Sequence, residues 1–135
     1  MAKNYFITGG AVFIGSNYVH HLLARGERVR IYDNLSRAGA SRNLQWLSET
    51  HGEKAYQVVV GDVRDASLLT ASSREADVIV HLAGQTAVTT SVVWPREDFE
   101  INALGTFNVL EAARLNERKP VLLYASTNKV YGGME

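Results

Sequence analysis

Near its amino terminus the chain reads Thr8-Gly9-Gly10-Ala11-Val12-Phe13-Ile14-Gly15-Ser16, directly after a short apolar run at residues 5–8. The apolar run predicts a strand, and the pattern after the glycines predicts a helix over residues 14–25. A glycine-rich turn between a strand and a helix places the helix amino terminus where a phosphate group can bind. This turn therefore predicts a nucleotide-binding unit at the start of the chain.

Runs of β-branched and aromatic residues recur at residues 5–8, 28–32, 56–60, 78–82 and 121–125. Three of them are nearly continuous in apolar side chains, as in a parallel sheet that is covered on both faces. Helical patterns occupy residues 14–25, 41–50, 65–71 and 95–115. This alternation predicts an α/β fold, a Rossmann-like doubly wound parallel sheet with five strands in the order 3-2-1-4-5. We expect one nucleotide-binding domain over residues 1–135.

The helix predicted over residues 95–115 carries two apolar stripes, of which a sheet can cover only one. One stripe holds Phe99, Ala103, Thr106, Leu110 and Ala113. The other holds Ile101, Leu104, Asn108 and Leu115. The uncovered stripe packs either on a neighbouring helix or at a subunit interface.

The composition excludes several classes of protein. The chain has 46% hydrophobic and 21% charged residues, which is typical of a folded globular domain. Fourteen basic and fourteen acidic residues cancel, so we expect neither a nucleic-acid partner nor an anionic membrane surface. The chain has no cysteine, which excludes disulfides, a thiolate nucleophile and a cysteine metal site. We expect a cytoplasmic protein without a metal ion.

Asp33 follows the second predicted strand, eighteen residues beyond Gly15. A carboxylate at this place can accept both ribose hydroxyls of an adenosine and repels a 2′-phosphate, which favours NAD over NADP. Arg37 lies close by and weakens that preference. The alternative is a structural glycine-rich turn with an unrelated surface aspartate.

Six ordered blocks resemble the extended short-chain dehydrogenase/reductase family, which includes nucleotide-sugar epimerases and dehydratases. They lie at residues 8–15, 32–37, 61–65, 81–85, 102–106 and 124–132. The resemblance implies NAD as the cofactor, with Asp62 and Val63 facing the adenine and Asn102 steadying the loops near the nicotinamide. The full set of implied cofactor contacts is Gly9, Phe13, Ile14, Asp33, Asn34, Arg37, Asp62, Val63, Leu82, Ala83, Gln85 and Asn102. We expect His81 to be a core histidine and not a catalyst.

The chain departs from the family pattern at two positions. Val12 replaces the middle glycine of the turn, where the missing side chain lets backbone approach the pyrophosphate. A valine there is expected to push the phosphates outward or to distort the turn. Trp94 precedes Pro95 where relatives commonly carry aspartate, which implies the loss of a helix cap.

The last block bears on the reaction. By resemblance, Thr127 is the catalytic hydroxyl that bonds the sugar oxygen being oxidised, and Val88, Thr127 and Asn128 contact the substrate. Related 4,6-dehydratases follow that threonine with Asp-Glu, which supplies an acid and a base for expelling water. Asn128-Lys129 is a poor pair for that elimination, which favours an epimerase.

Residues 32–37, 43–47 and 126–132 are most similar to the CDP-paratose 2-epimerase branch of the family. This similarity implies transient hydride transfer to tightly bound NAD, a nucleotide-sugar substrate with a CDP-linked deoxyhexose, and a homodimeric parent enzyme. The alternatives are a nucleotide-sugar 4,6-dehydratase or reductase, or a non-catalytic nucleotide-binding fragment.

The family's base is the tyrosine of a Tyr-x-x-x-Lys helix, and no tyrosine of this chain has a lysine four residues later. The chain also ends at Glu135, just past the fifth predicted strand. We therefore expect an incomplete amino-terminal portion without the substrate-binding lobe, and no catalytic activity from the 135 residues alone.

Overall fold

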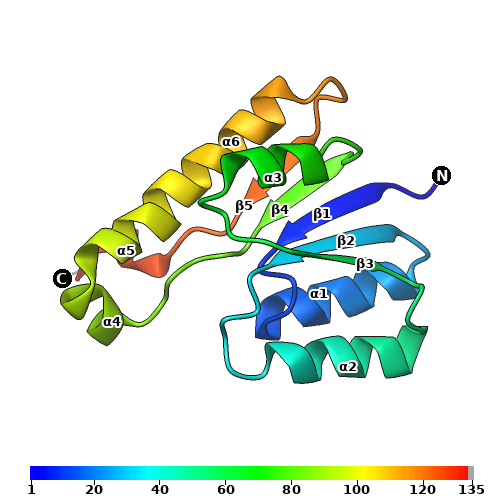
Figure 1. The fold of residues 1–135 in the computed structure, drawn as a ribbon, viewed down its shortest axis with the longest axis horizontal. Coiled ribbons are helices and arrows are strands. Elements are labelled where there is room, and N and C mark those ends of the chain that lie inside the picture. The colour runs from blue at the N-terminus through cyan, green and yellow to red at the C-terminus, as the bar shows by residue number, and fades with distance from the viewer. Residues whose placement is uncertain (134–135) are drawn as a thin grey trace.

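The computed structural model describes residues 1–133 and has a five-stranded parallel sheet at its centre (Figure 1). The strands are β1 Asn4–Thr8, β2 Arg28–Asp33, β3 Gln57–Val60, β4 Val78–His81 and β5 Val121–Tyr124. Their order is β3-β2-β1-β4-β5, and all four neighbouring pairs are parallel. The predicted fold class and strand order are confirmed, and each predicted strand end lies within one residue of the observed one.

Helices cover both faces of the sheet (Figure 1). The helices α1 Phe13–Ala24 and α2 Ala40–His51 lie on one face, and α3 Ala66–Ser72 and α6 Gly105–Leu115 lie on the other. None of the helices in the described part of the chain is long and apolar enough to cross a membrane.

The short helix α4 Val88–Val93 was not predicted, because five of its six residues are β-branched and favour strands. It precedes the helix α5 Pro95–Phe99, which the proline starts. The Trp94 cap position makes no side-chain hydrogen bond, as expected from the missing aspartate.

The hydrophobic core consists of two clusters, one on each face of the sheet. Ile7 and Ile31 are fully buried against α1 and α2, while Phe6, Tyr32 and Ile79 pack beneath α3 and α6. The edge strands are more open, since Val60 in β3 is 62% exposed and Val121 in β5 is 61% exposed. Coverage on both faces is therefore complete only for the three central strands.

The long helix predicted over residues 95–115 consists of α5, a π-helical segment at Glu100–Leu104 and α6. The buried face of α6 consists of Gly105, Asn108, Val109 and Ala112, of which only Asn108 belongs to a predicted stripe. The helix approaches closely at Gly105, because a Cβ there would lie 2.5 Å from Cγ2 of Val63. The exposed helix face, as we name it, consists of Phe99, Leu104, Phe107, Leu110 and Leu115.

Candidate functional site

A cleft of about 1120 Å³ lies at the carboxyl ends of the strands. All twelve predicted cofactor contacts line it, together with Val88 and Thr127. The side chain of Asn128 lies outside the described part of the structure. The loops after all five strands contribute to this cleft, as expected for a doubly wound sheet.

Sequence reasoning missed several residues that line the cleft. They include Ala38, Gly39, Asn43, Thr86, Ile101, Thr106, Tyr124, Ser126 and Lys129. Thr86 and Ser126 follow β4 and β5, so their place after a strand was the available signal. The start of α2 carried no such signal, because nothing in its sequence shows that it turns toward the cleft.

The glycine-rich turn packs closely against the loop after β4. Gly9 has a positive φ of 71°, and a Cβ on it would lie 2.8 Å from the backbone nitrogen of Ala83. A Cβ on Gly15 would clash with the carbonyl oxygen of Gly9. The turn therefore leads directly into the first residues of α1, whose amide groups have no acceptor within the helix. This arrangement suits an anionic group.

Val12 adopts an ordinary extended conformation, with φ −99° and ψ −179°. The expectation that valine distorts the turn is therefore wrong, because any L-residue adopts this backbone geometry. Its side chain is half-buried and lines the cleft. The other part of the expectation, that the valine side chain pushes the phosphates outward, does not depend on the backbone and stays a prediction.

Asp33 is only 7% exposed at the end of β2 and connects two parts of the cleft wall. Its Oδ2 accepts from the backbone nitrogen of Ala11 at 3.1 Å, and its Oδ1 accepts from that of Leu35 at 2.9 Å. The second bond holds Leu35 at a positive φ of 57°. Each carboxylate oxygen retains a second lone pair for a ligand hydroxyl.

Arg37 reaches from the loop after β2 to the loop after β4, where its Nη2 donates to Oγ1 of Thr86. Both residues line the cleft, so this contact joins two of its walls.

Asp62 forms a compact ion pair with Arg64, whose Nη2 lies 2.8 Å from Oδ2 of the carboxylate. The Arg64 hydrogen bonds lower the pKa of Asp62 to about 2. Asn34 donates to the same oxygen at 3.3 Å. Asp62 is therefore a fixed negative charge on the β3 side of the cleft.

Asn102 lies in the π-helical segment and fixes the loop after β4. Its Oδ1 accepts from the backbone nitrogen of Gln85 at 2.8 Å, and its Nδ2 donates to the carbonyl of Gln85 at 3.0 Å. π-Helical turns often occur at functional sites. The geometry agrees with the loop-steadying role that the resemblance implies.

Thr127 caps the short 3₁₀ helix Asn128–Tyr131, and its Oγ1 accepts from the backbone nitrogen of Lys129 at 3.2 Å. The hydroxyl proton is not used in that bond, so it remains available to a ligand oxygen.

His81 is 2% exposed, as expected for a core histidine, and it does not line the cleft. Burial lowers its pKa to about 4, so the ring is neutral at neutral pH.

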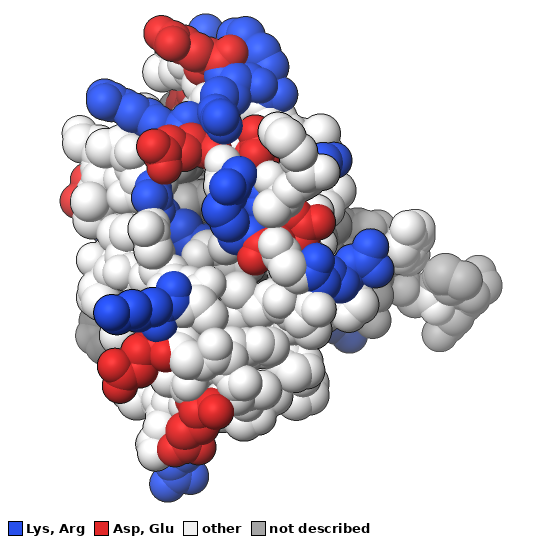
Figure 2. Space-filling view, turned by 90° about the vertical axis from the view of Figure 1, so that its right-hand side faces the viewer, with Lys and Arg blue, Asp and Glu red and all other residues white. Residues whose placement is uncertain are grey.

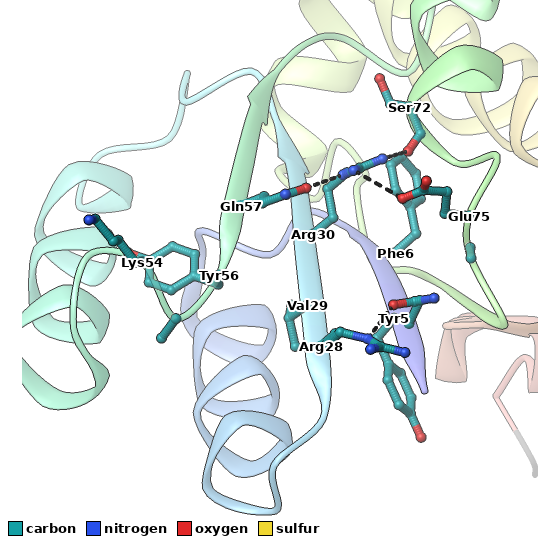
Figure 3. A pocket seen from close by; sticks show the side chains of 13 residues that line it. Tyr5, Phe6, Arg28, Val29, Arg30, Lys54, Tyr56, Gln57, Ser72 and Glu75 are labelled. Atoms are coloured by element: carbon teal, nitrogen blue, oxygen red, sulfur yellow. Dashed lines mark hydrogen bonds and ion pairs between the residues drawn. The ribbon is translucent and has the colours of Figure 1, made fainter. Parts of the chain in front are cut away.

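A second cavity of about 270 Å³ lies on the side opposite the cleft, at the amino-terminal ends of β1, β2 and β3 (Figure 3). Arg30 donates there to Oε1 of Gln57 at 2.8 Å and to the carbonyl of Ser72 at 2.6 Å, and it lies 3.7 Å from Glu75. Arg30 therefore joins β2 to β3 and to the end of α3.

Figure 2 shows basic and acidic side chains interspersed on this side of the molecule, without a large patch of one sign.

Comparison with known proteins connects the cleft to a family. The profile of the family described as GDP-mannose 4,6 dehydratase matches residues 6–135. The chain is 45% identical over 131 residues to CDP-paratose 2-epimerase of Salmonella typhi, and 35% identical over 131 residues to dTDP-glucose 4,6-dehydratase of Mycolicibacterium smegmatis. Each match covers 96% of this chain and 38% of the relative, so the chain spans well under half of their length.

A solved structure shares the fold. UDP-glucose-4-epimerase from Stenotrophomonas maltophila, with bound NAD and formylated UDP-arabinopyranose, matches with a TM-score of 0.83 and 30% identity. The match covers 96% of this chain and 38% of that chain.

Proposed function

The chain belongs to the GDP-mannose 4,6 dehydratase family of NAD-dependent epimerases and dehydratases, and we propose that its cleft is the NAD site of a nucleotide-sugar epimerase. The observation that carries this proposal is the buried carboxylate of Asp33 in the same cleft as the glycine-rich turn. An acidic side chain at the end of the second strand and a helix amino terminus after the first form the two ends of a dinucleotide site.

The cleft residues fit NAD in size and chemistry. Asp33 would accept the adenosine ribose hydroxyls, and the start of α1 would face the pyrophosphate. Leu82, Ala83 and Gln85 would line the middle of the cofactor. Bound NAD supplies a hydride acceptor.

The substrate side of the proposal rests on the loops after β4 and β5. Val88 and Thr127 line the same cleft as the cofactor residues. Thr127 would donate its free hydroxyl proton to a sugar oxygen, and we propose that Asn128 also contacts the sugar. The Asn128-Lys129 pair supports epimerisation over dehydration, because it offers no acid and base for expelling water.

Greater identity to the CDP-paratose 2-epimerase than to the dehydratase supports a CDP-linked deoxyhexose as the substrate. The exposed helix face supports a homodimeric enzyme. The 135 residues alone are expected to show no turnover, because they contain no Tyr-x-x-x-Lys motif.

Calorimetric titration with NAD and NADP tests the proposed site. The chain is expected to bind NAD at least about tenfold more tightly than NADP, since Asp33 repels a 2′-phosphate. Asp33→Asn is expected to weaken NAD binding by about 10- to 100-fold, because it removes the charge that strengthens the hydroxyl bonds. Glu117→Gln is the matched control, since this exposed side chain lies far from the cleft.

Thermal unfolding of Asp33→Asn verifies that the turn remains folded despite the change at the Ala11 and Leu35 contacts. Absence of NAD binding to the unmodified chain, or equal affinity for NAD in the Asp33→Asn and unmodified chains, would contradict the proposal.

A further inference from the structure

The ring of His81 lies between two threonine hydroxyls, one from buried Thr8 at the end of β1 and one from Thr106, which lines the cleft. Its Nδ1 is 2.6 Å from Oγ1 of Thr8, and its Nε2 is 2.9 Å from Oγ1 of Thr106. Thr8 immediately precedes Gly9 of the glycine-rich turn, while Thr106 follows the π-helical segment and lines the cleft. The ring itself is buried.

The position of every proton in this arrangement follows from the other contacts. Thr106 donates its hydroxyl proton to the carbonyl of Asn102 at 2.7 Å, so it must accept from Nε2–H of His81. Oγ1 of Thr8 accepts from the backbone nitrogens of Leu82 and Ala83, both at 3.2 Å. Its own proton is therefore directed to Nδ1 of His81.

The contacts of His81 with Thr8 and with Thr106 require the same tautomer, in which Nε2 is protonated and Nδ1 is unprotonated. The result is a chain of bonds in one direction: Thr8 donates to His81, His81 donates to Thr106, and Thr106 donates to the carbonyl of Asn102. The chain ends on the backbone of Asn102, whose side chain separately bonds the backbone of Gln85.

We propose that His81, as the neutral Nε2–H tautomer, is a positioning residue that holds the glycine-rich turn and the Asn102–Gln85 wall in register. An imidazole suits this task because it has a donor and an acceptor on opposite sides of one rigid ring. The effect on cofactor binding rests on the proposed function, whereas the tautomer and the coupling between the two walls do not.

Nitrogen-15 NMR of the histidines in the whole 135-residue chain tests the tautomer directly at neutral pH. The His81 signals are identified by their loss in His81→Gln. We expect a protonated Nε2 and an unprotonated Nδ1. An Nδ1–H tautomer or an imidazolium ring would overturn the proposal.

Two variants of Thr106 test the coupling. Thr106→Val keeps the shape but removes the hydroxyl, and is expected to shift the backbone amide signal of Gly9 and to weaken NAD binding roughly tenfold. Thr106→Ser keeps the hydroxyl and is expected to retain the tautomer, the Gly9 signal and the NAD affinity to within about twofold.

A Gly9 signal unchanged in Thr106→Val would overturn the coupling, because a merely local packing defect would not reach the turn. If the unmodified chain binds no NAD but shows the expected tautomer and Gly9 shift, the proposed function fails and the positioning role stands. If NAD binds and the two variants have equal affinity, the positioning role fails and the proposed function stands.

Discussion

At the scale of single residues, Val12 separates two reasons for a glycine in this turn, which are the backbone conformation and the close approach of a ligand. Its φ and ψ are ordinary, so the fold tolerates valine at the family's glycine position. The side chain nevertheless lies in the cleft beside the first residues of α1. Any cost of the valine therefore belongs to binding and not to folding.

We expect Val12→Gly to tighten NAD binding by about 1–3 kcal/mol, the usual cost of overpacking a close contact. Val12→Ala is expected to lie between the two, because a single methyl group crowds the cofactor less. Calorimetric titration of the three proteins measures this order. Equal affinities would mean that the pyrophosphate does not approach this turn.

The burial of His81 makes a prediction about stability and pH. Its pKa is about 4 in the folded chain and near its ordinary value of 6.5 in the unfolded chain. The unfolded state therefore binds the proton first as the pH falls, so the free energy of unfolding decreases between pH 6.5 and pH 4. The contribution of His81 is up to about 3 kcal/mol.

Denaturant unfolding of the unmodified chain and of His81→Gln across this pH range measures the effect. The variant is expected to be less stable at pH 7 but to lose less stability on acidification. His21→Gln is the control, because His21 is exposed. If acidification destabilises the His81→Gln and unmodified chains equally, the buried histidine is not the cause.

At the scale of elements, the long helix shows where pattern analysis reaches its limit. Both predicted stripes were apolar, yet the face that packs inward is built around Gly105, because only a glycine permits the approach to Val63. The π-helical segment before it adds a second difficulty. It changes the register between α5 and α6, so stripes drawn with a single helical period do not remain on one face.

The exposed helix face predicts self-association of the chain. Phe107 lies near the middle of this face and is 57% exposed, and β5, an edge strand of the sheet, contacts α6. We expect association at micromolar concentration, and we expect Phe107→Glu to reduce it without a loss of thermal stability. Light scattering over a dilution series measures both proteins. A monodisperse monomer at high concentration would show that this face does not mediate association.

At the scale of the whole molecule, the sequence predicted the sheet and the cleft better than the contacts inside the cleft. The predicted runs end at residues 8, 32 and 82, within one residue of the observed strand ends at Thr8, Asp33 and His81, and parallel strands bring those ends together. The His81 network could not be predicted, because Thr8 and Thr106 lie 73 and 25 residues from it. The Arg37 contact with Thr86 likewise depends on how two loops fold over the cleft.

The central claim is that the cleft at the carboxyl ends of the strands binds NAD. Titration of the nitrogen-15 labelled chain with NAD, followed by the backbone amide signals in NMR, tests it most directly. We predict saturable shifts for Gly9, Asp33 and Ala83, and no comparable shifts for Arg28 and Arg30 at the opposite edge of the sheet. Unchanged signals in the cleft, or saturable shifts centred on the opposite edge, would contradict the claim.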